Sequence, residues 1–95
     1  MLEATIGDTV ELKCYTFDET TWTHENDEGY VEFIYWYWWA FRPRLEVKFT
    51  PYKYHRLIIS DIQNNDSGRY NCYGYTRRRI IRYLLIVKGI CFFVV

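Results

Sequence analysis

Residues 57–72, LIISDIQNNDSGRYNC, constrain the fold of this chain more than any other stretch. Apolar residues alternate in its first part, a turn follows, and the last part places a tyrosine two positions before a cysteine on one face of a strand. This tyrosine–cysteine spacing is typical of a tyrosine corner, in which the ring packs inward while the hydroxyl bonds backbone near the turn. The positions that fit are Leu57, Ile59, Ile62, Asp66, Gly68, Tyr70 and Cys72.

At these seven positions the stretch resembles the region between strands E and F of the immunoglobulin superfamily. The resemblance covers Gly7 to Lys88 and implies an all-β fold, an immunoglobulin-like two-sheet antiparallel sandwich with Greek-key connections. A chain of 95 residues is close to the size of one such domain, which we expect to occupy residues 1–88. The apolar segment 89–95, GICFFVV, is too short for a membrane-spanning helix, which needs about 20 residues. It is either the start of a span or an extra strand.

The resemblance also implies a disulfide between Cys14 and Cys72 and a tryptophan packed against it. Alternating Val10, Leu12 and Cys14 predict a half-buried strand B. We expect strand C in the aromatic run 31–41, where Ile34-Tyr35-Trp36 has the apolar-x-tryptophan form that is usual in the family. Trp36 is therefore the expected tryptophan beside the disulfide, and Trp38 is the alternative.

The remaining connections follow from that placement. The polar, acidic residues 15–32 become an enlarged B–C loop, and residues 45–55 are too few for a full set of strands C′, C″ and D. The domain is then of a short variable or intermediate type. In some family members an arginine pairs with the aspartate of the turn before strand F, so Arg42, Arg44 or Arg56 is expected to meet Asp66.

Composition excludes several function classes. The 12 basic and 12 acidic residues cancel, so no overall field would hold nucleic acid or an anionic membrane. Three distant cysteines lack the paired spacing of zinc or redox sites and indicate one disulfide and a spare thiol at Cys91. His24 and His55 have no partners at ligand spacing and are expected at the surface. Because hydrolase, phosphate-binding and metalloprotease motifs are missing, we expect no enzyme activity, cofactor or metal.

The partner-binding site is predicted on the sheet formed by strands C, F and G. Outward residues of strands F and C would form an aromatic patch, and tyrosine and tryptophan are enriched at interfaces. A basic hairpin follows at its rim. The predicted contact residues are Tyr35, Tyr37, Trp39, Tyr73, Tyr75, Arg77, Arg78 and Arg79. The alternative is that the B–C loop or residues 89–95 cover this face.

We therefore expect an extracellular domain, secreted or part of a membrane protein, that binds a protein at the cell surface, either a second copy or a receptor. A sulfated glycan at the basic hairpin is an alternative partner, whereas nucleic acid is disfavoured. A virus-encoded immune-modulating glycoprotein is the leading alternative function, and a structural filament module is the third. Met1 is followed by no signal peptide, so we take it as an added initiator and expect a leader on the native protein. Asn65-Asp66-Ser67 meets the rule for N-glycosylation.

Overall fold

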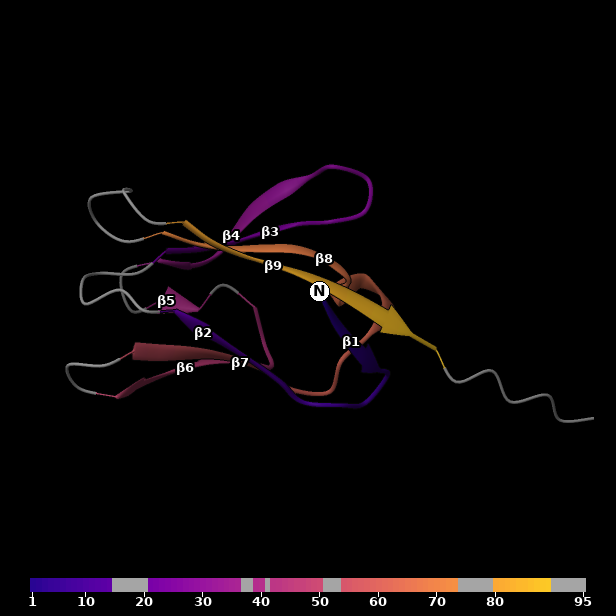
Figure 1. Ribbon diagram of the computed structural model, residues 1–95, viewed down its shortest axis with the longest axis horizontal. Coiled ribbons are helices and arrows are strands. Elements are labelled where there is room, and N and C mark those ends of the chain that lie inside the picture. The colour runs from indigo at the N-terminus through magenta and orange to yellow at the C-terminus, as the bar shows by residue number, and fades with distance from the viewer. Residues whose placement is uncertain (15–20, 37–38, 41, 51–53, 74–79, 90–95) are drawn as a thin grey trace, which may run out of the picture.

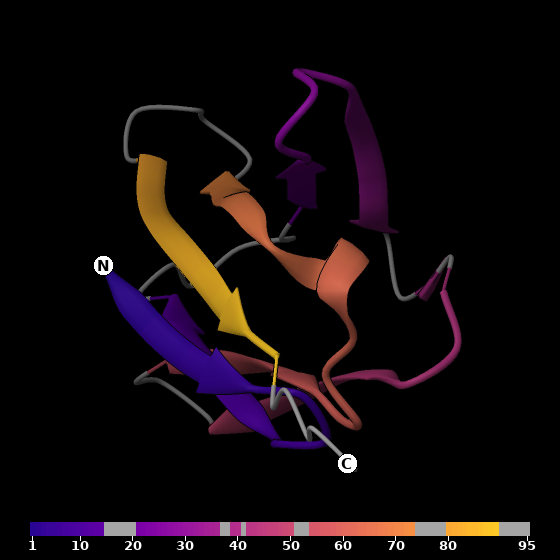
Figure 2. The ribbon, with the colours of Figure 1, turned by 90° about the vertical axis from the view of Figure 1, so that its right-hand side faces the viewer.

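The computed structural model consists of two packed β-sheets, whose neighbouring strands are antiparallel except for one pair (Figure 1, Figure 2). The structure describes residues 1–14, 21–36, 39–40, 42–50, 54–73 and 80–89. One sheet has the strand order β1-β9-β8-β3-β4-β5 and the other β2-β7-β6, and β1 runs parallel to β9. The strands are β1 Leu2–Thr5, β2 Val10–Cys14, β3 Thr21–Glu25, β4 Val31–Trp36, β5 Trp39–Ala40, β6 Leu45–Thr50, β7 Tyr54–Ile59, β8 Gly68–Tyr73 and β9 Ile80–Lys88.

This arrangement confirms the predicted immunoglobulin-like sandwich. Strand β2 corresponds to strand B, β7 to E, β8 to F and β9 to G. The Cys14–Cys72 disulfide joins β2 of one sheet to β8 of the other, as the resemblance implied. The core around it is assembled from both sheets. Its fully buried members include Leu12, Trp22, Ile34, Leu57, Ile59, Ile62, Tyr70 and Leu85.

The placement of strand C was wrong. Strand C is β3, Thr21–Glu25, which lies inside the segment that composition indicated was loop. The inward positions of β3 are filled by Trp22 and His24, and its outward positions are polar. Because this short strand has only two inward side chains, its sequence contains no run of apolar residues. The connection between β2 and β3 is therefore residues 15–20, and it is not enlarged.

Trp22 occupies the core position that had been assigned to Trp36. It is fully buried and lies directly opposite Cys72 across β3 and β8. Trp36 instead ends β4, opposite Thr21, and Trp38 lies outside the described residues. Because strand C comes earlier, β4 and β5 supply strands C′ and C″, and β6 supplies strand D. The set is complete, as in variable-type domains, contrary to the expectation from length.

The turn before β8 matches the predicted tyrosine corner. A short 3-10 helix, η1 Asn64–Asp66, precedes β8, and the Tyr70 hydroxyl donates to the Asp66 carbonyl. Among the three candidate arginines, Arg44 pairs with the buried Asp66 carboxylate at 2.9 Å. Arg42 pairs with Glu32 and Arg56 with Glu11.

Both histidines are buried, so the expectation that they lie at the surface was wrong. His24 and His55 are each 1% exposed. An imidazole packs well among aromatic rings, and each histidine contacts one: His24 stacks on Tyr70, and His55 meets Trp22 edge to face. Within the part of the chain that the structure describes, no helix has the length and apolarity needed to cross a membrane.

Candidate protein-binding site

The outer surface of the larger sheet is the candidate binding site, and the strand register defines its side chains. Residues that pair across β9, β8, β3 and β4 form two rows on this surface. One row runs Leu84, Arg69, Glu25, Val31, and the other runs Arg82, Asn71, Thr23, Phe33. The alternate residues of these strands, Trp22, Tyr70, Cys72 and Leu85 among them, point into the core. We call the outward surface of these four strands the outer face.

Apolar side chains are exposed on the outer face of β4 and at the position just before this strand. Tyr30 is 71% exposed, Val31 61% and Phe33 63%. Leu84 on β9 adds a further apolar side chain at the opposite side. Isolated exposed apolar residues are ordinary, but three within four consecutive positions of one hairpin form a patch of the kind that binds partners.

The centre of the outer face is polar and satisfied. Asn71 donates a hydrogen bond from Nδ2 to the Thr23 hydroxyl at 3.3 Å, and both side chains are buried. Polar side chains that are already hydrogen-bonded to each other can be excluded from water at a small cost in free energy. A partner can therefore cover this centre without leaving these two side chains unpaired.

Charge is divided across the outer face. Arg69 on β8 and Arg82 on β9 are exposed at one side. The hairpin formed by β3 and β4 carries the opposite sign on the other side, with three carboxylates at Glu25, Asp27 and Glu28. A surface with both signs separated in this way is complementary to a surface with the reverse arrangement.

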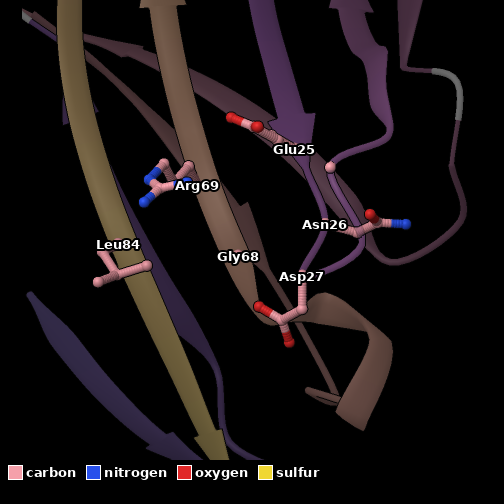
Figure 3. Close-up of a pocket in the computed structure, with 7 residues that line it drawn as sticks. Glu25, Asn26, Asp27, Gly68, Arg69 and Leu84 are labelled. Carbon is pink, nitrogen blue, oxygen red and sulfur yellow. The ribbon is translucent and has the colours of Figure 1, made fainter.

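A shallow hollow of about 240 Å³ lies between these two charged regions. Its lining comes from the β3–β4 hairpin, the start of β8 and the middle of β9, and consists of Glu25, Asn26, Asp27, Gly29, Gly68, Arg69 and Leu84. Figure 3 shows Glu25 and Arg69 side by side on neighbouring strands, with Leu84 beyond Arg69 on β9. The hollow offers carboxylates, a guanidinium and one apolar wall to a partner side chain.

The hairpin that carries the apolar patch has a defined tip. Asn26 holds the turn, because its side-chain oxygen accepts from the backbone N–H groups of Glu28 and Tyr30, both at 3.0 Å. Gly29 supplies the positive φ of 89° that the turn requires. The Ser67 hydroxyl donates to the Asp27 carboxylate at 2.6 Å and so connects the tip to the turn before β8.

His24 lies on β3, within this hairpin, and its side chain is buried. Its ring stacks on Tyr70 with centroids 4.4 Å apart, and Nε2 lies 2.7 Å from the Ser67 carbonyl oxygen. Burial is the largest influence on this imidazole and lowers its pKa below 6.5, and nearby Arg42 lowers it further. The Ser67 carbonyl, Asp66 and Asp27 act in the opposite direction. The ring is therefore neutral near pH 7.

The predicted contact residues are only partly described. Tyr73 lies on the outer side of β8 opposite Thr21 and is half-buried. Tyr35 is 6% exposed and part of the core cluster, so the prediction that it is an exposed contact on strand C was wrong. Trp39 lies on the edge strand β5. Tyr37, Tyr75, Arg77, Arg78 and Arg79, and the side chain of Trp39, lie outside the described residues.

Sequence reasoning missed the exposed apolar residues at the start of β4 and just before it. Tyr30 and Val31 were assigned to the end of a loop or the start of strand C, although Val31 and Phe33 alternate with Glu32 as outward residues of a strand do. The alternation was present, but the strand to which it belongs was misidentified.

One group of potential metal ligands is present in the described part of the chain. The ligand atoms of Cys14, His55 and Cys72 lie within 4.8 Å of one another. The two sulfur atoms are bonded to each other, so neither is a thiolate that can bind a metal ion. In this state the trio is a disulfide packed beside an imidazole.

Comparison with known proteins finds similarity in structure alone. No protein-family model matches the sequence, and no curated protein matches it either. Among solved structures, the ZIG-8 IG1 homodimer matches with a TM-score of 0.71 and 18% identity, over 94% of this chain and 78% of that chain. The ZIG-8–RIG-5 IG1–IG1 heterodimer in its monoclinic form matches with a TM-score of 0.75 and 19% identity, over 92% and 80%.

These matches and the disulfide-linked sandwich define the fold. The chain is an immunoglobulin-like domain. Its internal disulfide is typical of extracellular domains.

Proposed function

We propose that this domain is an extracellular recognition module at the cell surface, of the receptor or adhesion kind. It binds another immunoglobulin-like domain through its outer face, and a second copy of the chain is one such partner. The observation that carries the proposal is the exposed apolar patch of Tyr30, Val31 and Phe33 beside separated positive and negative regions. The two similar structures, which are dimers of immunoglobulin domains, support a partner of this kind.

The outer face is complementary to itself. In a dimer with twofold symmetry, each contact between two different residues occurs twice. If the acidic β3–β4 hairpin of one copy lies against Arg69 and Arg82 of the other, two attractive contacts form, with the apolar patches between them. Phe33 is then the central contact, joined by Tyr73. Tyr37, Trp39, Tyr75 and the basic residues 77–79 remain proposed contacts.

Sedimentation of the purified domain tests this proposal. We expect a monomer–dimer equilibrium that Phe33→Ser weakens by about 2 kcal/mol, the size of an interface hot spot. The thermal stability of the variant should be unchanged because Phe33 is exposed in the monomer. A wild-type domain that stays monomeric and binds no immunoglobulin-like domain through this face would contradict the proposal.

A charge-reversal pair tests the arrangement of the two copies. Arg82→Glu alone and Glu28→Arg alone should each weaken self-association, since each creates two repulsive contacts in the dimer. Mixing the two variants should restore association, because both contacts in the mixed dimer are then attractive. Lys48→Glu is the matched control, as Lys48 is exposed on β6 of the other sheet. A mixture no tighter than its components would exclude this arrangement.

A virus-encoded origin now has less support. It was inferred from an enlarged B–C loop, an unusual cysteine–tryptophan interval and a high aromatic content. Assigning β3 as strand C removes the first two grounds, because Trp22 follows Cys14 within the next strand. A cytosolic filament module fits poorly with the Cys14–Cys72 disulfide, which a reducing compartment would open.

We also propose that Asn65 is glycosylated when the domain is secreted from mammalian cells. Asn65 is exposed on η1, and Asp66 and Ser67 complete the acceptor sequence. Mass spectrometry before and after enzymatic deglycosylation measures the modification, with Asn65→Gln as the control. An unmodified Asn65 in the secreted domain would refute it.

A further inference from the structure

His24 has a hydrogen-bond partner among the described residues on only one of its two ring nitrogens. Nε2 lies 2.7 Å from the Ser67 carbonyl oxygen, and a carbonyl only accepts, so Nε2 carries the proton. Nδ1 is buried and has no hydrogen-bond partner among the described residues. A second proton would therefore place a charge on a buried nitrogen with nothing to accept from it, which is costly.

The charged groups around His24 are already engaged with other partners. From the tip of its own hairpin, Asp27 accepts from Ser67. On β4, Glu32 lies opposite His24 in the register and pairs with Arg42. On η1, Asp66 pairs with Arg44, and on β8 the Tyr70 ring covers one side of the imidazole. Each of these three carboxylates thus already has another partner.

Ser67 connects the imidazole to the hairpin that carries the apolar patch. Its carbonyl accepts from His24 and its hydroxyl donates to Asp27, so one residue holds both the strand and the tip of the hairpin. The next residue, Gly68, approaches the hairpin so closely that a Cβ atom there would lie 2.1 Å from the Glu25 carbonyl oxygen and 3.0 Å from Nε2 of His24. A charged ring that leaves this site breaks the contact between His24 and the Ser67 carbonyl.

We propose that protonation of His24 under mildly acidic conditions detaches the β3–β4 hairpin from the turn before β8 and thereby weakens binding at the outer face. The binding part of this inference rests on the proposed function, whereas the movement of the hairpin does not. Tyr30, Val31 and Phe33 all lie on the hairpin or its tip, so its displacement changes the apolar patch directly. The domain would release a partner as the pH falls.

Nuclear magnetic resonance on the wild-type domain tests the movement. The His24 ring and the backbone amides of residues 25–31 are followed from about pH 7.5 to about pH 5, above the ordinary carboxyl range. We expect the hairpin amides to shift with the same midpoint as the His24 ring, below about 6.5. Hairpin amides that do not change while His24 titrates, or a His24 ring that does not titrate in this range, would overturn the proposal.

Two variants assign the effect to one ring. His24→Phe keeps an aromatic ring against Tyr70 but cannot take up a proton, so its hairpin signals should no longer depend on pH. His55→Gln removes the other of the two histidines and should leave the wild-type response intact. A response that survives in His24→Phe, or is lost in His55→Gln, would overturn the assignment. If His24→Phe fails to fold, the wild-type titration and His55→Gln still decide.

Self-association at each pH tests the consequence for binding. Because each of the two copies in the dimer takes up one proton at His24, the dissociation constant for self-association should rise by at most about a hundredfold for each pH unit below the His24 midpoint. A hairpin that moves while the dissociation constant stays constant would overturn the link to binding. A domain that never self-associates would count against the proposed function, and the hairpin titration would still decide whether His24 acts as a switch.

Discussion

Trp22 on β3 and Cys72 on β8 lie directly opposite each other in the core, so the tryptophan beside the disulfide comes from the first strand after Cys14. This pair identifies β3 as strand C, although its sequence, TWTHE, is mostly polar. All later strand assignments follow from it, and so does the position of the hairpin that carries the exposed apolar patch.

Replacing Trp22 should destabilise the domain far more than replacing Trp36. Trp22→Ala empties a fully buried site and should lower the free energy of unfolding by about 3–5 kcal/mol. Trp36→Ala should cost less, because Trp22 and not Trp36 occupies the core position beside Cys72. Urea unfolding of both variants measures the difference. A larger loss for Trp36→Ala would mean that the core tryptophan has been misidentified.

Removing the disulfide should lower the free energy of unfolding by about 4 kcal/mol, since the bond closes a loop between residues separated by 58 positions. The double variant Cys14→Ala with Cys72→Ala, compared with the wild type by urea unfolding, gives this value. Cys91→Ser serves as the control, because it removes the remaining cysteine and leaves the Cys14–Cys72 bond intact. Peptide mapping without reduction should recover Cys14 linked to Cys72, and a link from either to Cys91 would contradict the structure.

Two glycines with positive φ should differ sharply in their tolerance of alanine. Gly68 has φ 127°, and its added Cβ would collide with the Glu25 carbonyl oxygen, so Gly68→Ala should cost about 3 kcal/mol or more. Gly29 has φ 89° with open space around it, so Gly29→Ala should cost only the backbone strain, about 1–2 kcal/mol. Equal losses in thermal unfolding would show that β3 does not approach Gly68 closely.

Replacing Arg44 should lower the free energy of unfolding more than replacing Arg56. Besides the Asp66 carboxylate, Arg44 donates to the carbonyl oxygens of Ser60 and Asp61 at 3.0 and 2.7 Å. Arg44→Met leaves Asp66 buried without its cation and should cost about 2–3 kcal/mol. Arg56→Met removes a pair with the exposed Glu11 and should cost less than about 1 kcal/mol. Chemical unfolding at neutral pH compares them, and the reverse order would contradict the assigned pairing.

Stability should fall below neutral pH because of His24. Burial, the largest influence, lowers the pKa of this group in the folded state, so the unfolded chain takes up a proton first as the pH falls. The contribution of His24 is complete above the unfolded pKa of about 6.5 and is lost as the pH falls from there to the folded-state value. Urea unfolding at several pH values should show this loss in the wild type and not in His24→Phe. An identical pH profile in both would assign the loss to other groups.

The sequence by itself determined the framework of the domain. The spacing of Asp66, Gly68, Tyr70 and Cys72 is read from neighbouring residues in one turn and one strand, and the structure confirms what it implied: the sandwich, the disulfide and the tyrosine corner. The alternation of Val10, Leu12 and Cys14 likewise predicted β2, because period two is a local property of a strand that has one buried face.

Only the tertiary structure decided which segment is strand C, which arginine meets Asp66 and which aromatic residues are exposed. A strand with few inward positions needs few apolar residues, so composition alone assigned β3 to a loop and gave its place to β4. The choice of Arg44 depends on how the chain enters β6, and the burial of His24 depends on Tyr70, more than forty positions away in the chain. These features depend on contacts between distant segments, which local periodicity does not encode.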